Sequence, residues 1–348
     1  MKKIVFGVLV TLVGMGVLGM ILLDIEAVQD TLTLRAADSL LSVDYESTHL
    51  EDSLNVFVCG SSSPIPDPDR AQACIAIITP NHFFIIDSGA GSTSNLLQAR
   101  LPMNRLQSIL LTHFHSDHIA EIYEVNLNSW VAGRPAPLNV YGPAGIEDVV
   151  EGINSTYKLD VGYRVAHHGA ELLPPHLGVL SAEEVAMGQI FEGDGLTITS
   201  FKVDHEPVSP AIGYKINYKG RTVVVTGDTV VTDGLAGMSL DSDLLLTDAL
   251  SLPLLEILSE AATAAGMSRN SKILMDVTDY HAQISNVESM ISKANVQLTG
   301  YYHMVPPPRN LLFQKYFERN LPDNALLTVD GMWFEMGVDD DKINVRYP

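Results

Sequence analysis

The sequence predicts an α/β fold for the body of the chain, residues 53–348. Hydrophobic residues make up 46% of the chain and charged residues 18%, a balance typical of globular proteins. From Leu54 onward, short runs rich in Val, Ile and Phe are bounded by Gly, Pro, Asn and Asp, a pattern typical of strands and turns. Segments with helical spacing of apolar residues separate these runs. Strands and helices that interleave along a chain favour an α/β architecture.

The apolar runs predict the individual elements. The expected strands are Leu54–Cys59, Cys74–Ile78, Phe83–Asp87, Ser108–Thr112, Leu138–Tyr141, Leu196–Val203, Ile212–Tyr218, Thr222–Thr226, Leu244–Thr247 and Gln297–Tyr302. Two further strands, Leu326–Val329 and Met332–Met336, flank Asp330-Gly331, a dipeptide suited to a tight hairpin turn. Apolar residues at helical spacing predict one helix that contains Ile146, Val149, Val150 and Ile153 and another that contains Ile284, Val287 and Ile291.

The N-terminal sequence predicts export from the cytoplasm. Lys2 and Lys3 precede twenty residues, Ile4–Leu23, without a charged side chain. A membrane-spanning helix needs about 20 apolar residues, and the two lysines would stay on the cytoplasmic side. Residues 1–23 are therefore expected to form a signal peptide or a membrane anchor, 24–52 a stalk and 53–348 the catalytic domain. The body would be periplasmic or extracellular, anchored to the inner membrane if residues 4–23 are not cleaved.

The two cysteines, Cys59 and Cys74, each lie in an apolar run that reads as a strand. In an oxidising compartment they could pair, which would stabilise the fold by ~3 kcal/mol. Two buried free thiols are an equal alternative, because the sequence does not give the distance between them.

The charge balance argues against a nucleic-acid partner. The chain has 42 acidic and 21 basic residues, a formal net charge of −21. The average field of such a surface repels phosphate backbones. We therefore expect a small-molecule substrate and no nucleic acid, while the number of copies in the assembly, including a homodimer, stays open.

The segment Thr112-His113-Phe114-His115-Ser116-Asp117-His118 is the strongest chemical motif. It follows the apolar run Ser108–Leu111, so a strand that ends in a loop would direct its side chains toward one point. Imidazole and carboxylate ligands suit zinc, with iron or manganese as alternatives. One segment could thus begin two adjacent metal sites.

The motif His-x-His-x-Asp-His resembles that of the metallo-β-lactamase superfamily. Three later residues match the rest of the family pattern: His205 before Ile212-Gly213-Tyr214, Asp228 in Gly227-Asp228-Thr229, and His303 after Gly300-Tyr301-Tyr302. The resemblance covers the chain from about residue 54 onward. It implies an αββα sandwich, in which two packed mixed β-sheets are flanked by helices.

The resemblance also implies the role of each residue. His113, His115 and His205 would hold a first divalent metal ion, Asp117, His118 and His303 a second, and Asp228 would bridge them. Two such ions, zinc in the family, would generate a metal-bound hydroxide that attacks the substrate. Asp117 would orient this nucleophile or take its proton. His281 matches a general acid, with a helix-capping or surface histidine as the alternative, although Ala282 stands where Ser or Thr is usual. Asp248 is either a residue that orients an imidazole or a turn residue.

Other candidate residues are expected outside the metal centre. Asp87 is expected to fix the loop beneath the metals, and His167 and His168, with Tyr163 and Arg164, could form either a substrate pocket or a helix-terminal cluster. The remaining histidines, His49, His82 and His176, are expected at the surface, since each lies beside turn or polar residues.

Within the superfamily, the chain is similar to the branch that contains tRNase Z and zinc-dependent arylsulfatase-like hydrolases. The closer likeness is to exported arylsulfatase-like members, through Cys59-Gly60, Pro64-x-Pro66-Asp67-Pro68-x-Arg70, Asp87-Ser88-Gly89, Trp130, Tyr141-Gly142-Pro143 and Tyr163-Arg164-x-x-His167-His168-Gly169. The expected activity is hydrolysis of a small anionic ester, an aryl sulfate or a phosphate ester. The alternatives are a lactone or β-lactam hydrolase, a tRNase Z-like phosphodiesterase and a metal-binding module without turnover.

Overall fold

The computed structural model describes residues 15, 20, 22–41, 52–319 and 321–348. The chain divides into two compact units, Met1–Thr48 and His49–Pro348. In the first unit, helix α2 spans Glu26–Leu41, where the sequence shows a weak helical period. The predicted export or anchor segment, residues 1–23, lies outside the described residues except for positions 15, 20, 22 and 23. No helix in the described ranges combines the length and apolar character that a membrane crossing requires.

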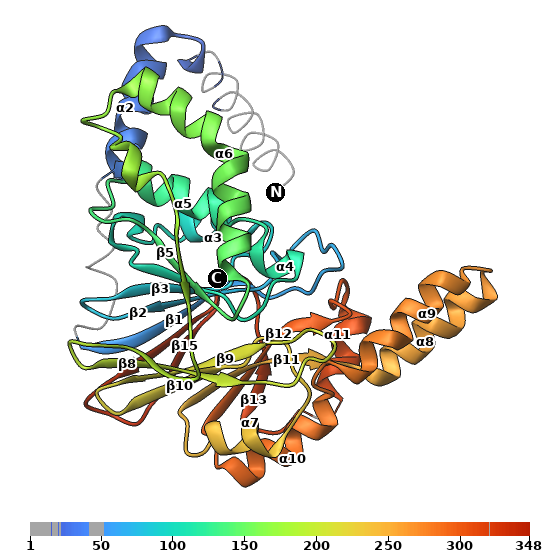
Figure 1. Cartoon of the computed structure of the whole chain (residues 1–348). Helices are drawn as coiled ribbons and strands as arrows, with labels where there is room; N and C mark the ends of the chain where they lie inside the picture. Colours follow the sequence, from blue (N-terminus) through green and yellow to red (C-terminus); the bar gives the residue numbers. More distant parts are fainter. Residues whose placement is uncertain (1–14, 16–19, 21, 42–51, 320) are drawn as a thin grey trace, which may run out of the picture. The chain divides into compact units, whose positions relative to one another are not determined.

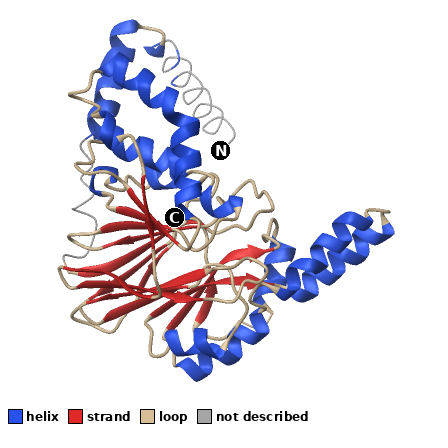
Figure 2. Ribbon diagram, in the orientation of Figure 1, coloured by secondary structure: helices blue, strands red, loops and turns tan. Residues whose placement is uncertain are grey.

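The second unit contains two β-sheets (Figures 1 and 2). The first sheet has the strand order β15-β14-β1-β2-β3-β4-β5-β6, and the second β13-β12-β11-β10-β9-β8-β7. The first is built from β1 (Ser53–Gly60), β2 (Cys74–Ile78), β3 (Phe83–Ile86), β4 (Ser108–Leu110), β5 (Asn139–Gly142), β6 (Ser181–Glu184), β14 (Trp333–Gly337) and β15 (Asn344–Arg346). The second is built from β7 (Gly188–Gly193), β8 (Leu196–Lys202), β9 (Ile212–Tyr218), β10 (Arg221–Val225), β11 (Leu244–Leu250), β12 (Leu298–Val305) and β13 (Ala325–Leu327).

Helices cover the outer faces of both sheets (Figure 1). On the side of the first sheet lie α3 (Ser92–Gln98), α4 (Ser116–Ile119), α5 (Ile122–Val131) and α6 (Ile146–His168). On the side of the second lie α7 (Asp233–Met238), α10 (Ile284–Ala294) and α11 (Leu311–Glu318), while α8 (Leu252–Ala264) and α9 (Ser268–Asp276) project from its edge. This is the expected αββα sandwich with two mixed sheets.

Strand β10 shows how the layers are held together. Val223 and Val225 point into the core between the sheets, where Ile77 of the first sheet also lies. Val224 points the other way and packs in the cluster that contains Ile291 of α10. Successive side chains of a strand alternate between its faces, so a run of three valines suits a sheet that is covered on both sides.

The predicted hairpin at Asp330-Gly331 is wrong. β13 pairs with β12 in the second sheet, whereas β14 pairs with β1 in the first. The turn therefore carries the chain from one sheet to the other. The Asp330 carboxylate accepts hydrogen bonds from the backbone N–H and hydroxyl of Ser61, at 2.9 and 2.6 Å, and from the backbone N–H of Ala71. A turn dipeptide specifies a change of direction, but the partner strand is chosen by packing elsewhere.

The two cysteines are paired. Cys59 and Cys74 form a disulfide between β1 and β2, so the alternative of free thiols is wrong.

Three strands, β6, β7 and β15, are not among the expected strands. β6 and β15 contain few apolar residues and are partly exposed, so they lack the alternating pattern on which the prediction depends.

Candidate active site

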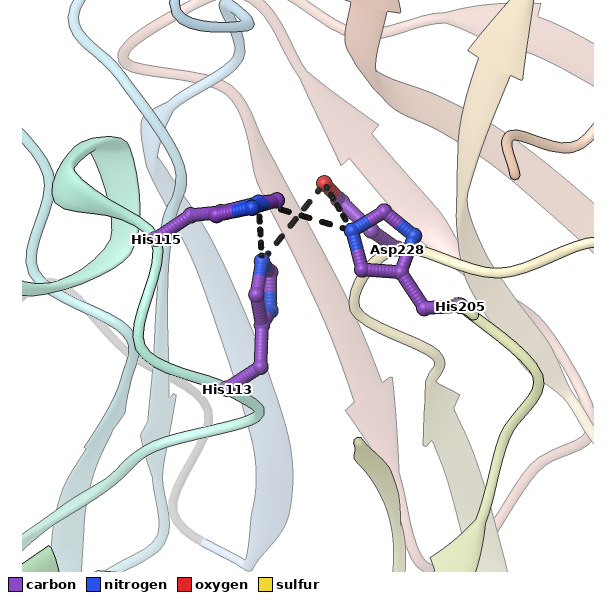
Figure 3. Close-up of side chains that lie close together, drawn as sticks. All are labelled: His113, His115, His205 and Asp228. Atoms are coloured by element: carbon purple, nitrogen blue, oxygen red, sulfur yellow. Dashed lines mark hydrogen bonds and ion pairs between the residues drawn. The ribbon is translucent and has the colours of Figure 1, made fainter. Parts of the chain in front are cut away.

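The motif His-x-His-x-Asp-His occupies the loop after β4 and the first turn of α4. β4 ends at Leu110, and His113 and His115 follow in the loop. Asp117 and His118 lie in α4, where both side chains are buried. Figure 3 shows the imidazoles of His113 and His115 directed toward His205 and Asp228, which come from the opposite side of the site.

The remaining predicted ligands come from the second sheet. His205 follows β8, Asp228 follows β10 and His303 lies near the end of β12. β10, β11 and β12 are parallel neighbours, so their carboxyl ends meet at one edge. Gly227 allows the close approach of the two halves, because an added Cβ would lie 2.7 Å from the Cβ of Thr112.

The first group of donors consists of His113, His115, His205 and Asp228, all within 4.8 Å of one another. His115 Nδ1 lies 3.0 Å from His113 Nε2 and 3.5 Å from His205 Nε2. Asp228 Oδ2 lies 3.9 Å from His113 Nε2 and 3.8 Å from His205 Nε2. Ligand atoms at tetrahedral positions around zinc are separated by about 3.3 Å, given bonds of about 2.0 Å. These spacings fit a tetrahedral cation site.

The second group consists of Asp117, His118 and His303. Asp117 Oδ2 lies 2.9 Å from His303 Nε2 and 3.6 Å from His118 Nε2. Asp228 reaches this group as well, since its Oδ2 is 3.5 Å from His118 Nε2 and its Oδ1 is 3.3 Å from His303 Nδ1. Asp228 therefore lies where a carboxylate can bridge two cations, and the structure brings all seven predicted ligands together.

Unpartnered atoms show that the residues fit a metal pair. Nε2 of His118, Oδ1 of Asp228 and Nδ1 of His303 are buried and have no hydrogen-bond partner among the described residues. A buried polar atom without a partner costs ~1–3 kcal/mol. Two divalent cations would satisfy these atoms, and a set of imidazole and carboxylate donors without thiolate suits zinc in a catalytic centre.

Hydrogen bonds from neighbouring groups fix the ligand orientations. The Asp87 carboxylate accepts from His118 Nδ1 at 2.8 Å and from the backbone N–H of Thr112 at 2.8 Å. His205 Nδ1 donates to the backbone carbonyl of Tyr280 at 2.8 Å. Such contacts leave the other ring nitrogen free for a metal. Asp87 has φ 58° and His303 φ 45°, and strained backbone of this kind is concentrated at functional sites.

The first three histidines are held in the neutral form. Burial lowers the pKa of His113 well below its ordinary value, and it also lowers the pKa of His115 and His205. Neutral imidazole is the form that binds a metal ion. This half of the site is therefore ready to bind without releasing protons near neutral pH.

The other half is charged when no metal is bound. Burial alone would lower the pKa of His118 and His303, but the nearby carboxylates outweigh it and raise both. Burial would likewise raise the pKa of Asp117 and Asp228, yet the surrounding imidazoles lower both. Ionised carboxylates thus face protonated imidazoles, and a metal ion would replace these protons.

His281 lies at the edge of the metal donors. Its Nδ1 is 2.9 Å from Asp248 Oδ2, which also accepts from the backbone N–H of Ala282 at 3.1 Å. An ionised carboxylate can only accept, so Nδ1 carries the proton and Nε2 is the free nitrogen. Donor atoms of His281, Asp228 and His303 also lie within 4.8 Å of one another, but the bond to Asp248 favours proton transfer over metal ligation.

The histidines outside the metal centre were only partly predicted. His82 is buried rather than at the surface, bonded to Thr79 at 2.8 Å and packed against Phe191. His176 is exposed, and His49 lies outside the described residues. His167 and His168 are exposed at the end of α6, which is the helix-terminal arrangement, and Arg164 pairs with Asp160 at 2.6 Å.

Tyr280 is a site residue that the sequence analysis missed. Its ring lies 4.8 Å from that of His205 and 4.7 Å from that of His281, measured between centroids. Its position directly before the candidate general acid was the one available indication. The backbone bond to His205 depends on the fold and has no counterpart in the sequence.

With this geometry established, comparison with known proteins identifies the family. The family described as Beta-lactamase superfamily domain matches residues 82–304. The chain belongs to the metallo-β-lactamase superfamily. It is a hydrolase of this superfamily, and its clusters of His and Asp are suited to two zinc ions.

Within the superfamily, the chain is related to proteins named Ribonuclease Z. It is 35% identical over 256 residues to Ribonuclease Z of Mycobacterium bovis (strain BCG / Pasteur 1173P2), which covers 73% of this chain and 86% of the relative. The protein of the same name from Mycobacterium marinum (strain ATCC BAA-535 / M) is 33% identical, with 73% and 87% covered.

Solved structures support the superfamily fold. The metallo-β-lactamase fold protein YhfI from Bacillus subtilis aligns with a TM-score of 0.59 at 18% identity, covering 82% of this chain and 99% of that one. The short form of human tRNase Z aligns with a TM-score of 0.56 at 17% identity, covering 80% and 98%.

The expected arylsulfatase-like activity is contradicted by these relatives, which are named Ribonuclease Z. Two residues of the motifs behind that prediction have structural roles. Trp130 is buried with Leu173 and Leu177, and Arg70 bonds to Ser61 and the carbonyl of Thr328, both at 2.7 Å. Residues that hold the fold together carry no information about the ester that is cleaved.

The expectation of no nucleic-acid partner is contradicted by the same relatives. It rested on the net charge of −21, an average over the whole chain. Residues 265–319 carry six basic and four acidic side chains, so the segment that contains His281 and His303 departs from that average. Contacts with phosphate depend on local charge at distances within the Debye length, about 8–10 Å in physiological salt.

Proposed function

We propose that this chain is a metal-dependent phosphodiesterase that acts on RNA. The observation that carries the proposal is the Asp248–His281 pair beside the two groups of metal donors, in a chain whose relatives are named Ribonuclease Z. Cleavage of a phosphodiester requires a stabilised phosphoryl group, an activated water and a protonated leaving oxygen. The residues at this site can serve all three needs.

The ligands fix where the phosphoryl group would bind. His113, His115 and His205 would hold one cation and Asp117, His118 and His303 the other, with Asp228 between them. Bound zinc supplies Lewis-acid stabilisation of the phosphate and lowers the pKa of water. The Asp117 carboxylate, kept ionised by His118 and His303, can orient the attacking water or take its proton.

His281 supplies the proton for the leaving group. Asp248 holds the ring through Nδ1–H at 2.9 Å, so Nε2 is the nitrogen that takes up a second proton from solvent and then delivers it to the departing oxygen, which leaves the ring neutral with Nδ1–H still on Asp248. General acid catalysis of this kind contributes roughly 10²- to 10⁴-fold to the rate. Asp248 also accepts from the backbone N–H of Ala282, which keeps the loop and the ring in one geometry without a Ser or Thr side chain at position 282.

A substrate panel tests this function. The full-length chain, loaded with zinc, would be assayed on an RNA hairpin with an unpaired 3′ tail, bis(p-nitrophenyl) phosphate, p-nitrophenyl sulfate and a homoserine lactone. We expect cleavage of the RNA and of the simple phosphodiester. Faster turnover of the lactone than of either phosphodiester would contradict the proposal.

We further propose that the body is exported. The uncharged segment Ile4–Leu23 after Lys2 and Lys3 supports this, as does the disulfide between Cys59 and Cys74, since disulfides persist in oxidising compartments. RNA would then reach the site outside the cytoplasm. Alkaline phosphatase fused after residue 348 should be active in a bacterial host, whereas an active cytoplasmic reporter such as β-galactosidase at that position would contradict export.

A further inference from the structure

Helices α8 and α9 form a hairpin at the edge of the sheet that carries the active site (Figure 1). α8 begins at Leu252, four residues after Asp248, and α9 ends at Asp276, five residues before His281. The two helices are joined at the Ser271 hydroxyl, which accepts a hydrogen bond from the Thr263 hydroxyl at 2.8 Å and shares one with the Ser259 hydroxyl at 2.7 Å. The hairpin is therefore inserted between the two members of the proposed proton-transfer pair.

A pocket of about 440 Å³ lies against this hairpin. Leu258 and Ile273 line it from α8 and α9, and Pro306, Pro307 and Phe313 line it from the chain that follows β12. None of the residues of the metal centre lines it. Pockets of about 300–1,000 Å³ suit small organic ligands or part of a larger one.

The pocket lies close to the metal donors along the chain. Pro306 is three residues beyond His303, which places the wall about 10 Å further along at ~3.3 Å per residue. Ile65, another lining residue, belongs to the loop after β1, in which Ser62 bridges to Met304 beside His303. A ligand group in the pocket would thus be within about three nucleotides of a phosphate at the metals, given a rise of about 3.4 Å per nucleotide in a stacked strand.

The chemistry of the pocket combines flat apolar walls with two polar side chains. Phe313 offers an aromatic face, Asn270 an amide that can both donate and accept, and Arg309 a guanidinium. Arg309 donates to the carbonyl of Pro66, which holds it at the rim. Unpaired bases are recognised by stacking on aromatic or guanidinium planes and by hydrogen bonds to their edges.

We propose that this pocket binds an unpaired nucleobase of the RNA strand, within about three nucleotides of the scissile phosphodiester. The inference rests on the proposed function and names the part of the substrate that the hairpin recognises. Charge complementarity favours this occupant, because residues 265–319 carry six basic and four acidic side chains in a chain that is otherwise strongly acidic. Arg269 at the start of α9 is exposed and has no ionic partner in the described part of the chain.

The test combines a change in the pocket with removal of one base. The substrate is the RNA hairpin with an unpaired 3′ tail, prepared with normal bases and with single abasic sites at successive positions beside the cleaved bond. The protein variants are Phe313→Ala and the exposed Asn270→Ala, whose folding is checked by circular dichroism. Ile257→Ala serves as the matched control, because Ile257 lies on α8 at 48% exposure and does not line the pocket.

In the unaltered chain, we expect one abasic position to raise KM by about tenfold, the effect of losing one stacked base. Phe313→Ala and Asn270→Ala should raise KM for the normal RNA and make it insensitive to that abasic site. Their turnover of bis(p-nitrophenyl) phosphate should not change. Ile257→Ala should match the unaltered chain in KM for the normal RNA, in the effect of the abasic site and in turnover of bis(p-nitrophenyl) phosphate.

Two outcomes would overturn the inference while leaving the phosphodiesterase intact. One is that the abasic effect is as large in Phe313→Ala and Asn270→Ala as in the unaltered chain. The other is that these variants lose sedimentation with phosphatidylglycerol vesicles but cleave RNA normally, which would assign the pocket to a lipid surface. Failure of the unaltered chain to cleave bis(p-nitrophenyl) phosphate would instead contradict the proposed function.

Discussion

In three histidines of this site, one ring nitrogen is hydrogen-bonded to a neighbouring group, and the other is available for a metal ion or a proton. His118 and His205 use Nδ1 on Asp87 and on the carbonyl of Tyr280, so each presents Nε2 to the metal position. His281 uses Nδ1 on Asp248. A hydrogen bond at Nδ1 therefore leaves Nε2 free in all three histidines. In His118 and His205 the free Nε2 faces a metal position, whereas in His281 it is available for proton transfer.

The role of His281 predicts a dependence on the leaving group. His281→Ala should lower kcat by roughly 10²-fold or more for RNA, whose leaving alkoxide needs a proton. The effect on bis(p-nitrophenyl) phosphate should be small, because p-nitrophenolate leaves without protonation. Asp248→Asn should show the same selectivity to a lesser degree, as measured by steady-state kinetics on both substrates.

Metal content is the control for these variants. Both should retain two zinc ions per chain by mass spectrometry, since neither residue is among the seven predicted ligands. An equal loss of activity on both substrates, with less metal, would show that His281 acts as a ligand instead.

The charged and neutral halves of the site predict a pH dependence of metal binding. The pKa of His118 and His303 is raised above the ordinary 6.5, so near neutral pH a metal ion at their site must displace protons. The pKa of His113, His115 and His205 is lowered, so their site releases none. Affinity at the Asp117, His118 and His303 site should therefore rise more steeply with pH.

Calorimetric titration with zinc in buffers of different ionisation enthalpy counts the protons released at each step. The two steps should differ in proton release. Equal release for both ions across pH 6 to 8 would contradict this assignment of charge, given ordinary histidine titration near ~6.5.

The site could be predicted from the sequence where its signals are local. Four of the seven ligands lie within His113–His118, and that spacing alone indicates a metal site. The environment of His82 could not be predicted in this way, because it is buried by Phe191, more than one hundred residues away in sequence. The hydrogen bond from His205 to the backbone carbonyl of Tyr280 could not be predicted either, because every residue has a backbone carbonyl.

At the level of elements, the site depends on two strand ends that meet closely. Gly227, just after β10, has φ 64° and faces Thr112, just after β4. Only glycine suits this position, since other residues are strained at positive φ and a Cβ would overlap the neighbouring segment. The spacing of the ligands from the two sheets thus depends on a residue that binds nothing.

A pair of glycine substitutions tests this dependence. Gly220→Ala, at φ 97° with no atom within 4 Å of the added Cβ, should cost about 1–2 kcal/mol of unfolding free energy from strain alone. Gly227→Ala should cost a further ~1–3 kcal/mol from overlap with Thr112 and should reduce zinc content. Denaturant unfolding and metal analysis measure both effects. Equal costs for the two variants would contradict the close approach.

Elements with strong alternation or helical period could be predicted, whereas pairing could not. Cys74–Ile78 and Ile212–Tyr218 form strands with the expected bounds because their apolar runs are buried in the sandwich. The strands on either side of Asp330-Gly331 were expected to pair with each other, yet they belong to different sheets. Their partners, β12 and β1, are set by the packing of the two sheets, which a turn dipeptide does not encode.

At the scale of the whole molecule, charge is unevenly distributed along the chain. The net charge of −21 coexists with a segment, residues 265–319, in which basic side chains outnumber acidic ones by six to four. An acidic chain with one less acidic segment would repel RNA over most of its length and repel it least in the segment that contains His281 and His303. Net charge by itself is therefore a poor guide to the substrate.

The composition of residues 265–319 predicts the salt dependence of RNA binding. Arg269→Gln should weaken binding and lower the slope of log Kd against log salt by up to about 0.7, the value for one phosphate contact on a single strand. Lys158→Gln on α6, outside the segment, should leave the slope unchanged. Fluorescence anisotropy over a range of salt concentrations measures both. A larger effect of Lys158→Gln would place the RNA on the other side of the molecule.

The most direct measurement is cleavage of the 3′-tailed RNA hairpin by the full-length, zinc-loaded chain and by Asp228→Ala, with zinc content determined in the same samples. Asp228 contacts both donor groups, so the variant should lose zinc and at least ~10²-fold in rate. The unaltered chain should bind two zinc ions and cleave the RNA. Two bound zinc ions without RNA cleavage, or an Asp228→Ala variant that keeps both zinc and activity, would contradict a dinuclear RNA phosphodiesterase.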